Sequence, residues 1–125
     1  MKDGKHVILC IDDDQDFLDS LGMMIENEGY VVVTASSAEE GLKKYKEEKP
    51  DMVLVDLMME EVDAGTSFVT DAKALGPTPP IVMLSSVGDR LSTSTDYSEL
   101  GLSGVLQKPV DPRILASTLQ AKLKA

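Results

Sequence analysis

Aromatic residues and cysteine are scarce in this 125-residue chain, which excludes an aromatic core and an internal disulfide. Aromatics make up 4% of the residues and Trp is absent, so aliphatic side chains and methionine must build the core. The single cysteine, Cys10, cannot form an internal disulfide, and its apolar neighbours predict a buried, inert thiol. The single histidine, His6, supports neither a metal cluster nor a phosphorelay within the chain.

Positive charge and long apolar runs are also in short supply. The chain has 12 Lys and Arg against 22 Asp and Glu, and its net charge is −10. This charge argues against direct nucleic-acid binding, which needs a basic face, but permits a basic partner surface or divalent cations. No apolar run approaches the roughly 20 residues that cross a bilayer, and the N-terminus shows no signal-peptide pattern. We therefore expect a cytoplasmic protein without a membrane partner.

Apolar stretches alternate with helical patterns along the chain. The length suits one domain over residues 1–125, ordered from about residue 5 to residue 124, with no output domain. Strands are predicted at 7–11, 30–35, 52–56, 81–84 and 104–107. Helices are predicted from Phe17 to Glu28, from a capping box at 36–40 to Pro50, at 66–75, at 89–101, and after Asp111-Pro112.

Two of these helices carry more detailed expectations. The helix at 66–75 should point Phe68, Val69, Ala72 and Leu75 inward. The helix at 89–101 is rich in serine and threonine, which are poor helix formers, so it should be the weakest.

The alternation indicates an α/β fold with a doubly wound, five-stranded parallel sheet, flavodoxin-like, between two layers that share five helices. Right-handed crossovers restrict the topology, and the order 2-1-3-4-5 brings the ends of the first and third strands together. The third strand, 52–56, is apolar up to its last residue, as is typical of strands buried on both faces. Asp56 ends that strand, where ligands bind in such sheets.

Polar residues gather at the carboxyl ends of the predicted strands. Asp12 and Asp13 follow the first strand, Asp56 ends the third, and Ser85 and Lys108 follow the fourth and fifth. Alone, each has an ordinary explanation as a turn residue, a helix cap or a solvated charge, but together they favour a site. Oxygen ligands select a hard cation. A site that offers only a few protein ligands and leaves the rest to water suits Mg²⁺ better than Ca²⁺.

The motifs at these ends resemble those of the receiver domain of two-component response regulators, and the resemblance covers almost the whole chain. They are Ile11-Asp12-Asp13-Asp14, Val55-Asp56-Leu57-Met58-Met59, Leu84-Ser85-Ser86 and Lys108-Pro109. The resemblance implies that Asp56 is the phospho-acceptor, which takes a phosphoryl group from a histidine kinase or a phosphotransfer protein. It implies a signalling protein whose only catalysis is its own phosphorylation and dephosphorylation.

The same resemblance implies further roles for individual residues. Mg²⁺ would be bound by Asp12, Asp13, Asp56 and the backbone carbonyl of Met58. Ser85 and Lys108 would contact the phosphoryl oxygens. A downstream protein would bind the face formed by the fourth helix, the fifth strand and the fifth helix.

Several positions depart from the pattern of that family. Glu60-Glu61 replaces a common Pro-Gly pair, Ser85 replaces the commoner Thr, and Val105 stands where an aromatic switch residue is usual. Met58 and Val87, which would flank the path of the hydrolytic water, are both apolar, and this predicts a long-lived phosphorylated state.

Two other functions stay open from the residues alone. One is a receiver-like interaction module that no longer uses phosphate. The other is a Mg²⁺-dependent phosphohydrolase with an aspartate nucleophile. Haloacid-dehalogenase-like phosphohydrolases carry a second Asp two residues after the nucleophile, where this chain has Met58 and no cap-domain sequence.

Overall fold

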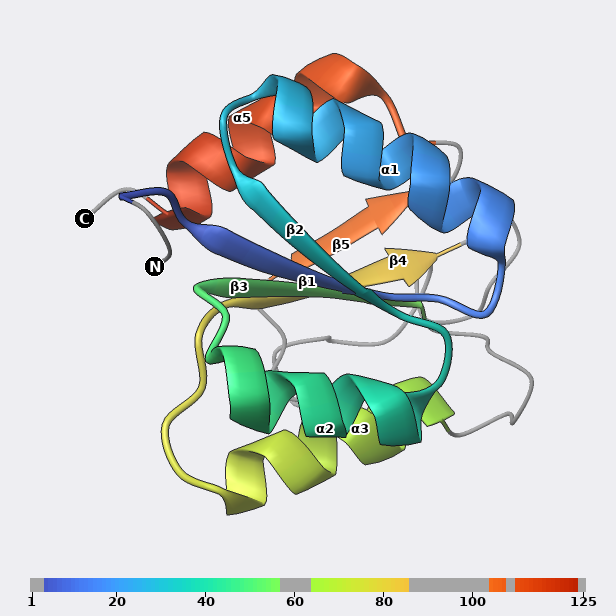
Figure 1. The fold of residues 1–125 in the computed structure, drawn as a ribbon, viewed down its shortest axis with the longest axis vertical. Helices are drawn as coiled ribbons and strands as arrows, with labels where there is room; N and C mark the ends of the chain where they lie inside the picture. The colour runs from blue at the N-terminus through green and yellow to red at the C-terminus, as the bar shows by residue number, and fades with distance from the viewer. Residues whose placement is uncertain (1–3, 57–63, 86–103, 108–109, 124–125) are drawn as a thin grey trace.

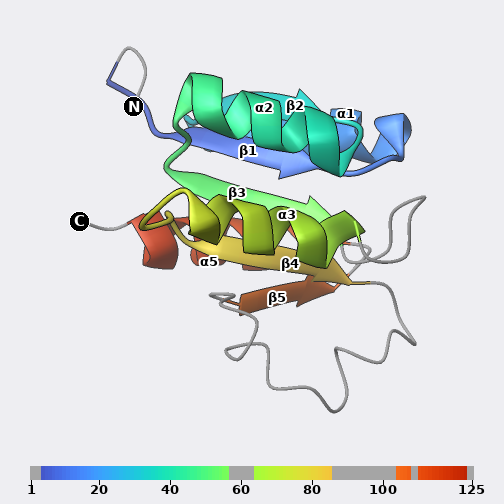
Figure 2. The ribbon, with the colours of Figure 1, turned by 90° about the horizontal axis from the view of Figure 1, so that it is seen from below.

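The computed structural model describes residues 4–56, 64–85, 104–107 and 110–123. Its centre is a parallel sheet of five strands in the order β2-β1-β3-β4-β5 (Figures 1 and 2). The strands are β1 (Val7–Ile11), β2 (Val31–Ala35), β3 (Met52–Asp56), β4 (Ile81–Ser85) and β5 (Gly104–Gln107). The predicted strand positions and their order are confirmed, with shifts of one residue at the start of β2 and the end of β4.

Helices cover both faces of the sheet. Helices α1 (Gln15–Asn27) and α5 (Pro112–Leu123) lie on one face, and α2 (Ala38–Glu48) and α3 (Ala64–Ala74) lie on the other (Figure 1). The fourth predicted helix, at 89–101, falls outside the described residues. The described part of the chain therefore supports the two-layer arrangement with four of the five predicted helices.

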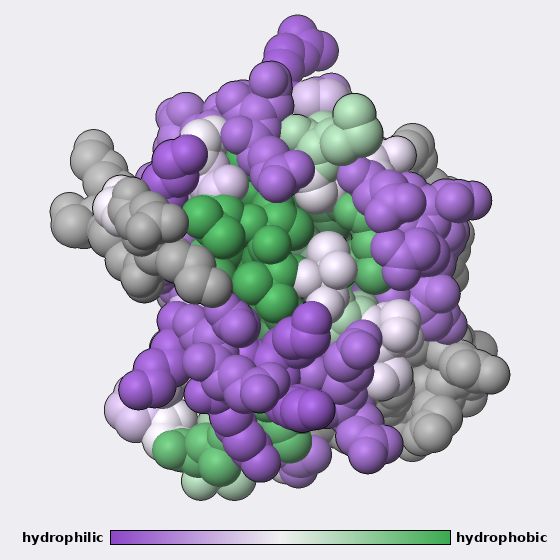
Figure 3. Space-filling model, in the orientation of Figure 1, coloured by the Kyte–Doolittle hydropathy of each residue, from purple (hydrophilic) through white to green (hydrophobic). Residues whose placement is uncertain are grey.

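The core divides into two clusters, one on each side of the sheet. Alternate side chains of the strands enter each cluster, so the central strands β1 and β3 are buried along their whole length. The edge strand β2 is only half-buried at Val31–Thr34, because no strand covers its outer side. Figure 3 shows the resulting apolar surface between α1 and α2.

The predicted burial of one residue of α3 is wrong. Phe68, Val69 and Ala72 of α3 are buried as expected, but the side chain of Leu75 is 55% exposed. The helix ends at Ala74, and Gly76 follows with a φ of +126°, so helical spacing no longer sets the direction of Leu75.

The first turns of α1 and α2 are capped by the side chains that precede them. Asp14 caps α1, and its side chain accepts the N–H of Phe17 at 3.2 Å. In the predicted capping box at 36–40, the N-cap of α2 is Ser37, whose hydroxyl oxygen accepts the N–H of Glu40 at 3.1 Å. The carboxylate of Glu40 accepts the backbone N–H of Ser36 at 2.7 Å, and this hydrogen bond lowers the pKa of Glu40.

Candidate functional site

The site is built where β1 and β3 end beside each other. Ile11 pairs with Val55 in the parallel register, so the next residue on each strand, Asp12 and Asp56, comes out at the same edge. Asp13 follows Asp12 in the short link to α1. The strand order, rather than any local contact, therefore brings together residues more than 40 positions apart in sequence.

Three carboxylates meet at this edge. One oxygen each of Asp12, Asp13 and Asp56 lies within 4.8 Å of the other two. Asp12 is fully buried and Asp56 is 4% exposed, whereas Asp13 is exposed. Two buried carboxylates and one at the rim form a cluster that is open from one side.

Backbone hydrogen bonds hold Asp12 in place. Its N–H donates to the carbonyl oxygen of Ala35 at 3.1 Å, which extends the pairing of β1 and β2 by one residue. Its Oδ1 accepts the N–H of Asp14 at 2.9 Å. Because Asp14 also caps α1, the start of the helix and the orientation of the Asp12 carboxylate are linked.

The negative charge of this cluster acts on a neighbour in the core. Burial, and after it the charge of Asp12, raise the pKa of Cys10 well above its ordinary range. The sulfur is therefore a buried neutral thiol, as predicted.

The three carboxylates fit a divalent cation. They offer hard oxygen ligands without sulfur or nitrogen, and the spacing of their oxygens lets them share one ion. Asp12, Asp13 and Asp56 are the residues that would hold it.

The remaining predicted site residues are only partly described. The backbone of Ser85 ends β4 one position beyond the partner of Asp56, and it pairs with Gln107, the residue before Lys108. The side chains of Ser85 and Val105 lie outside the described part, as do Met58, Glu60, Glu61, Val87, Lys108 and Pro109. Their predicted roles stay predictions.

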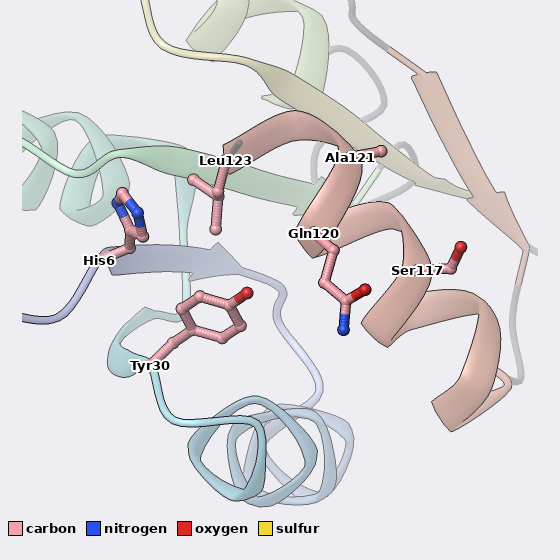
Figure 4. Close-up of a pocket in the computed structure, with 6 residues that line it drawn as sticks. All are labelled: His6, Tyr30, Ser117, Gln120, Ala121 and Leu123. Atoms are coloured by element: carbon pink, nitrogen blue, oxygen red, sulfur yellow. The ribbon is translucent and has the colours of Figure 1, made fainter. Parts of the chain in front are cut away.

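A cavity of about 540 Å³ lies at the opposite, amino end of the sheet, between α5 and the start of β1 and β2. Its lining residues, which Figure 4 shows on these elements, are His6, Tyr30, Ser117, Gln120, Ala121 and Leu123. The Nδ1 atom of His6 lies 3.8 Å from Oδ2 of Asp51. His6 is therefore remote from the carboxylate cluster, in line with its exclusion as a ligand.

A family model described as the response regulator receiver domain matches residues 8–120. The chain belongs to this family. The match includes the strands and carboxylates described above, and it agrees with the resemblance that the four strand-end motifs indicate.

Solved structures of receiver domains share the fold. A CheY-like response regulator receiver domain protein from Methanospirillum hungatei is 32% identical, with a TM-score of 0.85 over 96% of this chain and 94% of that one. The chemotaxis protein CheY4 of Vibrio cholerae is 27% identical, with a TM-score of 0.83 over 96% of this chain and 100% of that one. The flavodoxin-like class is thus confirmed.

Curated relatives of this receiver domain are longer proteins. The transcriptional regulatory protein GlrR of Escherichia coli is 34% identical over 117 residues, which are 94% of this chain and 26% of that protein. The regulatory protein PhoP of Bacillus subtilis is 32% identical over 94% of this chain and 48% of that protein. The receiver domain thus spans about a quarter to a half of these relatives, and their transcriptional activity belongs to the whole proteins.

Membership of the family carries general properties. Receiver domains are signalling proteins of two-component systems rather than classical enzymes, and they interact with histidine kinases and downstream effectors. Members typically bind Mg²⁺ at an acidic pocket, and this receiver domain has an acidic cluster at the corresponding edge. Within the described residues, no helix is long and apolar enough to cross a membrane.

Proposed function

We propose that this receiver domain is a phosphorylation-dependent switch in which Asp56 accepts a phosphoryl group from a histidine kinase or a phosphotransfer protein. The convergence of Asp12, Asp13 and Asp56 within 4.8 Å is the observation that carries the proposal. The position of Asp56 at the end of a central strand supports it, because ligands bind at that edge of such sheets.

The transfer requires charge neutralisation more than covalent chemistry. An oxygen of Asp56 forms the new bond to phosphorus while the bond from phosphorus to the donor's imidazole nitrogen breaks, and that nitrogen keeps the electron pair. A bound Mg²⁺ supplies positive charge that lowers the repulsion between carboxylate and phosphoryl group. Asp12, Asp13, Asp56 and the carbonyl of Met58 would hold the ion, and Ser85 and Lys108 would contact the phosphoryl oxygens.

The proposal is tested by labelling with a small phosphodonor. Intact-mass spectrometry after incubation with acetyl phosphate and Mg²⁺ should show one added phosphoryl group on the wild type and none on Asp56→Asn. Asp51→Asn, which removes an acidic residue at the other end of the same strand, is the matched control and should be labelled like the wild type. Equal labelling of wild type and Asp56→Asn would falsify the assignment of the acceptor.

Labelling, together with a Mg²⁺-binding assay and a turnover assay with common phosphate esters, separates the other functions that the residues left open. A protein that binds no Mg²⁺ and accepts no phosphoryl group would be an interaction module instead. Repeated turnover of common phosphate esters would indicate a phosphohydrolase.

A further inference from the structure

A second groove lies at the amino end of the sheet, on the face covered by α2 and α3. It has a volume of about 510 Å³, within the range of natural binding pockets. Its walls come from the end of α2 and from the link between α3 and β4, which pass each other at the left of Figure 1. The lining residues that matter here are Tyr45, Lys46, Lys49, Leu75, Pro77 and Pro79.

The floor and walls of this groove are apolar and held in place. Leu75 is one of only a few large hydrophobic side chains exposed in the described residues, and it is 55% exposed. The ring of Tyr45 stands edge-on to the buried ring of Phe68, with centroids 5.8 Å apart, so its position is set by the core. Pro77 and Pro79 have little conformational freedom to lose when a ligand binds.

The rim of the groove is positive in a protein that is otherwise acidic. Lys46 and Lys49 are exposed and line it, and neither Glu47 nor Glu48 does. Four of the eight Lys and Arg in the described residues lie within seven positions of the chain, and these are Lys43, Lys44, Lys46 and Lys49. Figure 3 shows apolar surface at the lower left, where α3 ends, beside the hydrophilic side chains over α2.

We propose that this groove binds a short acidic segment of a partner protein. An apolar side chain of that segment would cover Leu75 and Tyr45, and carboxylates on either side of it would pair with Lys46 and Lys49. The charge complementarity is local, because the net charge of the chain is −10. A long uniform polyanion such as nucleic acid or an anionic membrane would also face the acidic remainder, whereas a short peptide meets only the rim.

This binding is expected to be independent of phosphorylation. The groove is at the amino ends of β3 and β4, and Asp56 is at the carboxyl end of β3. Five residues of extended strand separate the two ends by roughly 16 Å. A partner in the groove therefore leaves Asp56 accessible and can stay bound to both the phosphorylated and the unphosphorylated protein. The proposal for the groove does not depend on the proposed role of Asp56.

The test is an NMR titration of the ¹⁵N-labelled protein with the hexapeptide Glu-Asp-Leu-Phe-Asp-Glu. Amide N–H shifts should change at residues 45–49, 74–76 and 78, since the prolines among the lining residues carry no N–H. The neutral analogue Gln-Asn-Leu-Phe-Asn-Gln should bind about five- to tenfold more weakly, since two exposed ion pairs are lost. The double variant Lys46→Gln, Lys49→Asn should bind the acidic peptide more weakly than wild type by a similar factor. Asn is chosen at position 49 because it tolerates the left-handed backbone conformation of Lys49.

Two controls separate the groove from general charge effects. The variant Lys5→Gln, Lys122→Gln changes the net charge equally but alters exposed lysines that neither line the groove nor belong to the cluster at 43–49, and it should bind like the wild type. Asp56→Asn should bind equally well, so loss of the phosphoryl acceptor and loss of the groove give different results. Leu75→Ser should bind more weakly than wild type.

Several outcomes overturn the proposal. These are absent or scattered shift changes, equal binding of the neutral peptide, and equal weakening by the two lysine pairs. Stronger binding of phosphatidylserine vesicles to wild type than to the Lys46→Gln, Lys49→Asn variant would identify a membrane site instead. A dimer in sedimentation velocity that this variant abolishes would identify a second copy of the chain as the occupant.

Discussion

Asp12 and Asp13 are neighbours in sequence, but their side chains have different surroundings. Asp12 is fully buried and accepts the N–H of Asp14, whereas Asp13 is exposed at the rim of the cluster. Removing either carboxylate should weaken Mg²⁺ binding by about tenfold or more, since even changes around a metal ligand can cost that much. Isothermal titration calorimetry of Asp12→Asn and Asp13→Asn against wild type measures this loss.

Stability separates the two aspartates further. Asp12→Ala should be less stable than Asp12→Asn by about 1 kcal/mol without metal, because only Asn keeps an acceptor for the Asp14 N–H. At the exposed Asp13, Ala and Asn should agree within about 0.5 kcal/mol. Urea unfolding in EDTA gives both differences, and equal Ala-minus-Asn differences at the two positions would contradict the role given to the buried carboxylate.

Asp51 joins the starts of β1 and β3 and has a pH-dependent role. Its carboxylate accepts the N–H of Val7 at 2.7 Å and lies 3.8 Å from Nδ1 of His6. Partial burial alone would raise the pKa of Asp51, but the Val7 hydrogen bond and the His6 imidazole help to outweigh it, and the pKa is lowered. A lowered folded-state pKa means that this stabilisation is present above the unfolded-state value and is lost as the pH falls through the folded-state one.

We therefore predict that wild type loses more stability than Asp51→Asn when the pH falls from about 5 to about 3. Asn keeps an oxygen for the Val7 N–H but carries no charge to titrate. Urea unfolding across this pH range measures the difference, with Asp71→Asn, an exposed site on α3, as the control that should follow wild type. Parallel curves for all three proteins would count against the Asp51 assignment.

At the scale of elements, the approach of α2 to the sheet depends on one glycine. A Cβ built at Gly41 would lie 2.5 Å from Cδ1 and 2.9 Å from Cγ1 of Ile11, the residue before Asp12. Alanine should favour the helix by about 1 kcal/mol, but overpacking typically costs about 1–3 kcal/mol. Gly41→Ala should therefore be destabilising by about 1 kcal/mol in thermal or urea unfolding.

A second background and a second glycine make this prediction specific. In Ile11→Val, which lacks the Cδ1 atom, Gly41→Ala should cost at least about 0.5 kcal/mol less than in wild type. At Gly22 of α1 the nearest atom to an added Cβ is 3.5 Å away, so Gly22→Ala should be stabilising. A stabilising effect of Gly41→Ala, like the one expected for Gly22→Ala, would show that packing against Ile11 does not limit the approach of α2 to the sheet.

At the scale of the whole molecule, the proposed switch must carry a signal from Asp56 to a partner face. That face is proposed to comprise the predicted helix at 89–101, β5 and α5. The serine- and threonine-rich sequence of 89–101 has low helix propensity, so its local structure should respond readily to a change at the acceptor. Hydrogen exchange with beryllofluoride, a phosphoryl mimic, should alter protection between residues 86 and 107. Identical exchange there with and without the mimic would rule out this route.

The fold and the core of the site could be predicted from the sequence because each depends on periodicity. Apolar runs of five residues mark strands buried on both faces, and alternation with helices restricts the sheet to a few topologies. Once β1 and β3 are adjacent, Asp12 and Asp56 must share an edge, and the spacing of their carboxylate oxygens in the structure agrees. The caps at Asp14 and Ser37 follow from side chains that reach only their own helix.

What the sequence determined by itself was therefore local pattern and strand order, and these determine which carboxylates converge. Only the tertiary structure decided features that depend on where an element stops and what packs beside it. Leu75 matched the apolar spacing of α3 but became exposed, because the helix ends one residue earlier and the chain turns at Gly76. The groove beside Lys46 and Lys49 also depends on tertiary structure. It is lined by two segments that are distant in sequence, and no periodic pattern in the sequence relates one segment to the other.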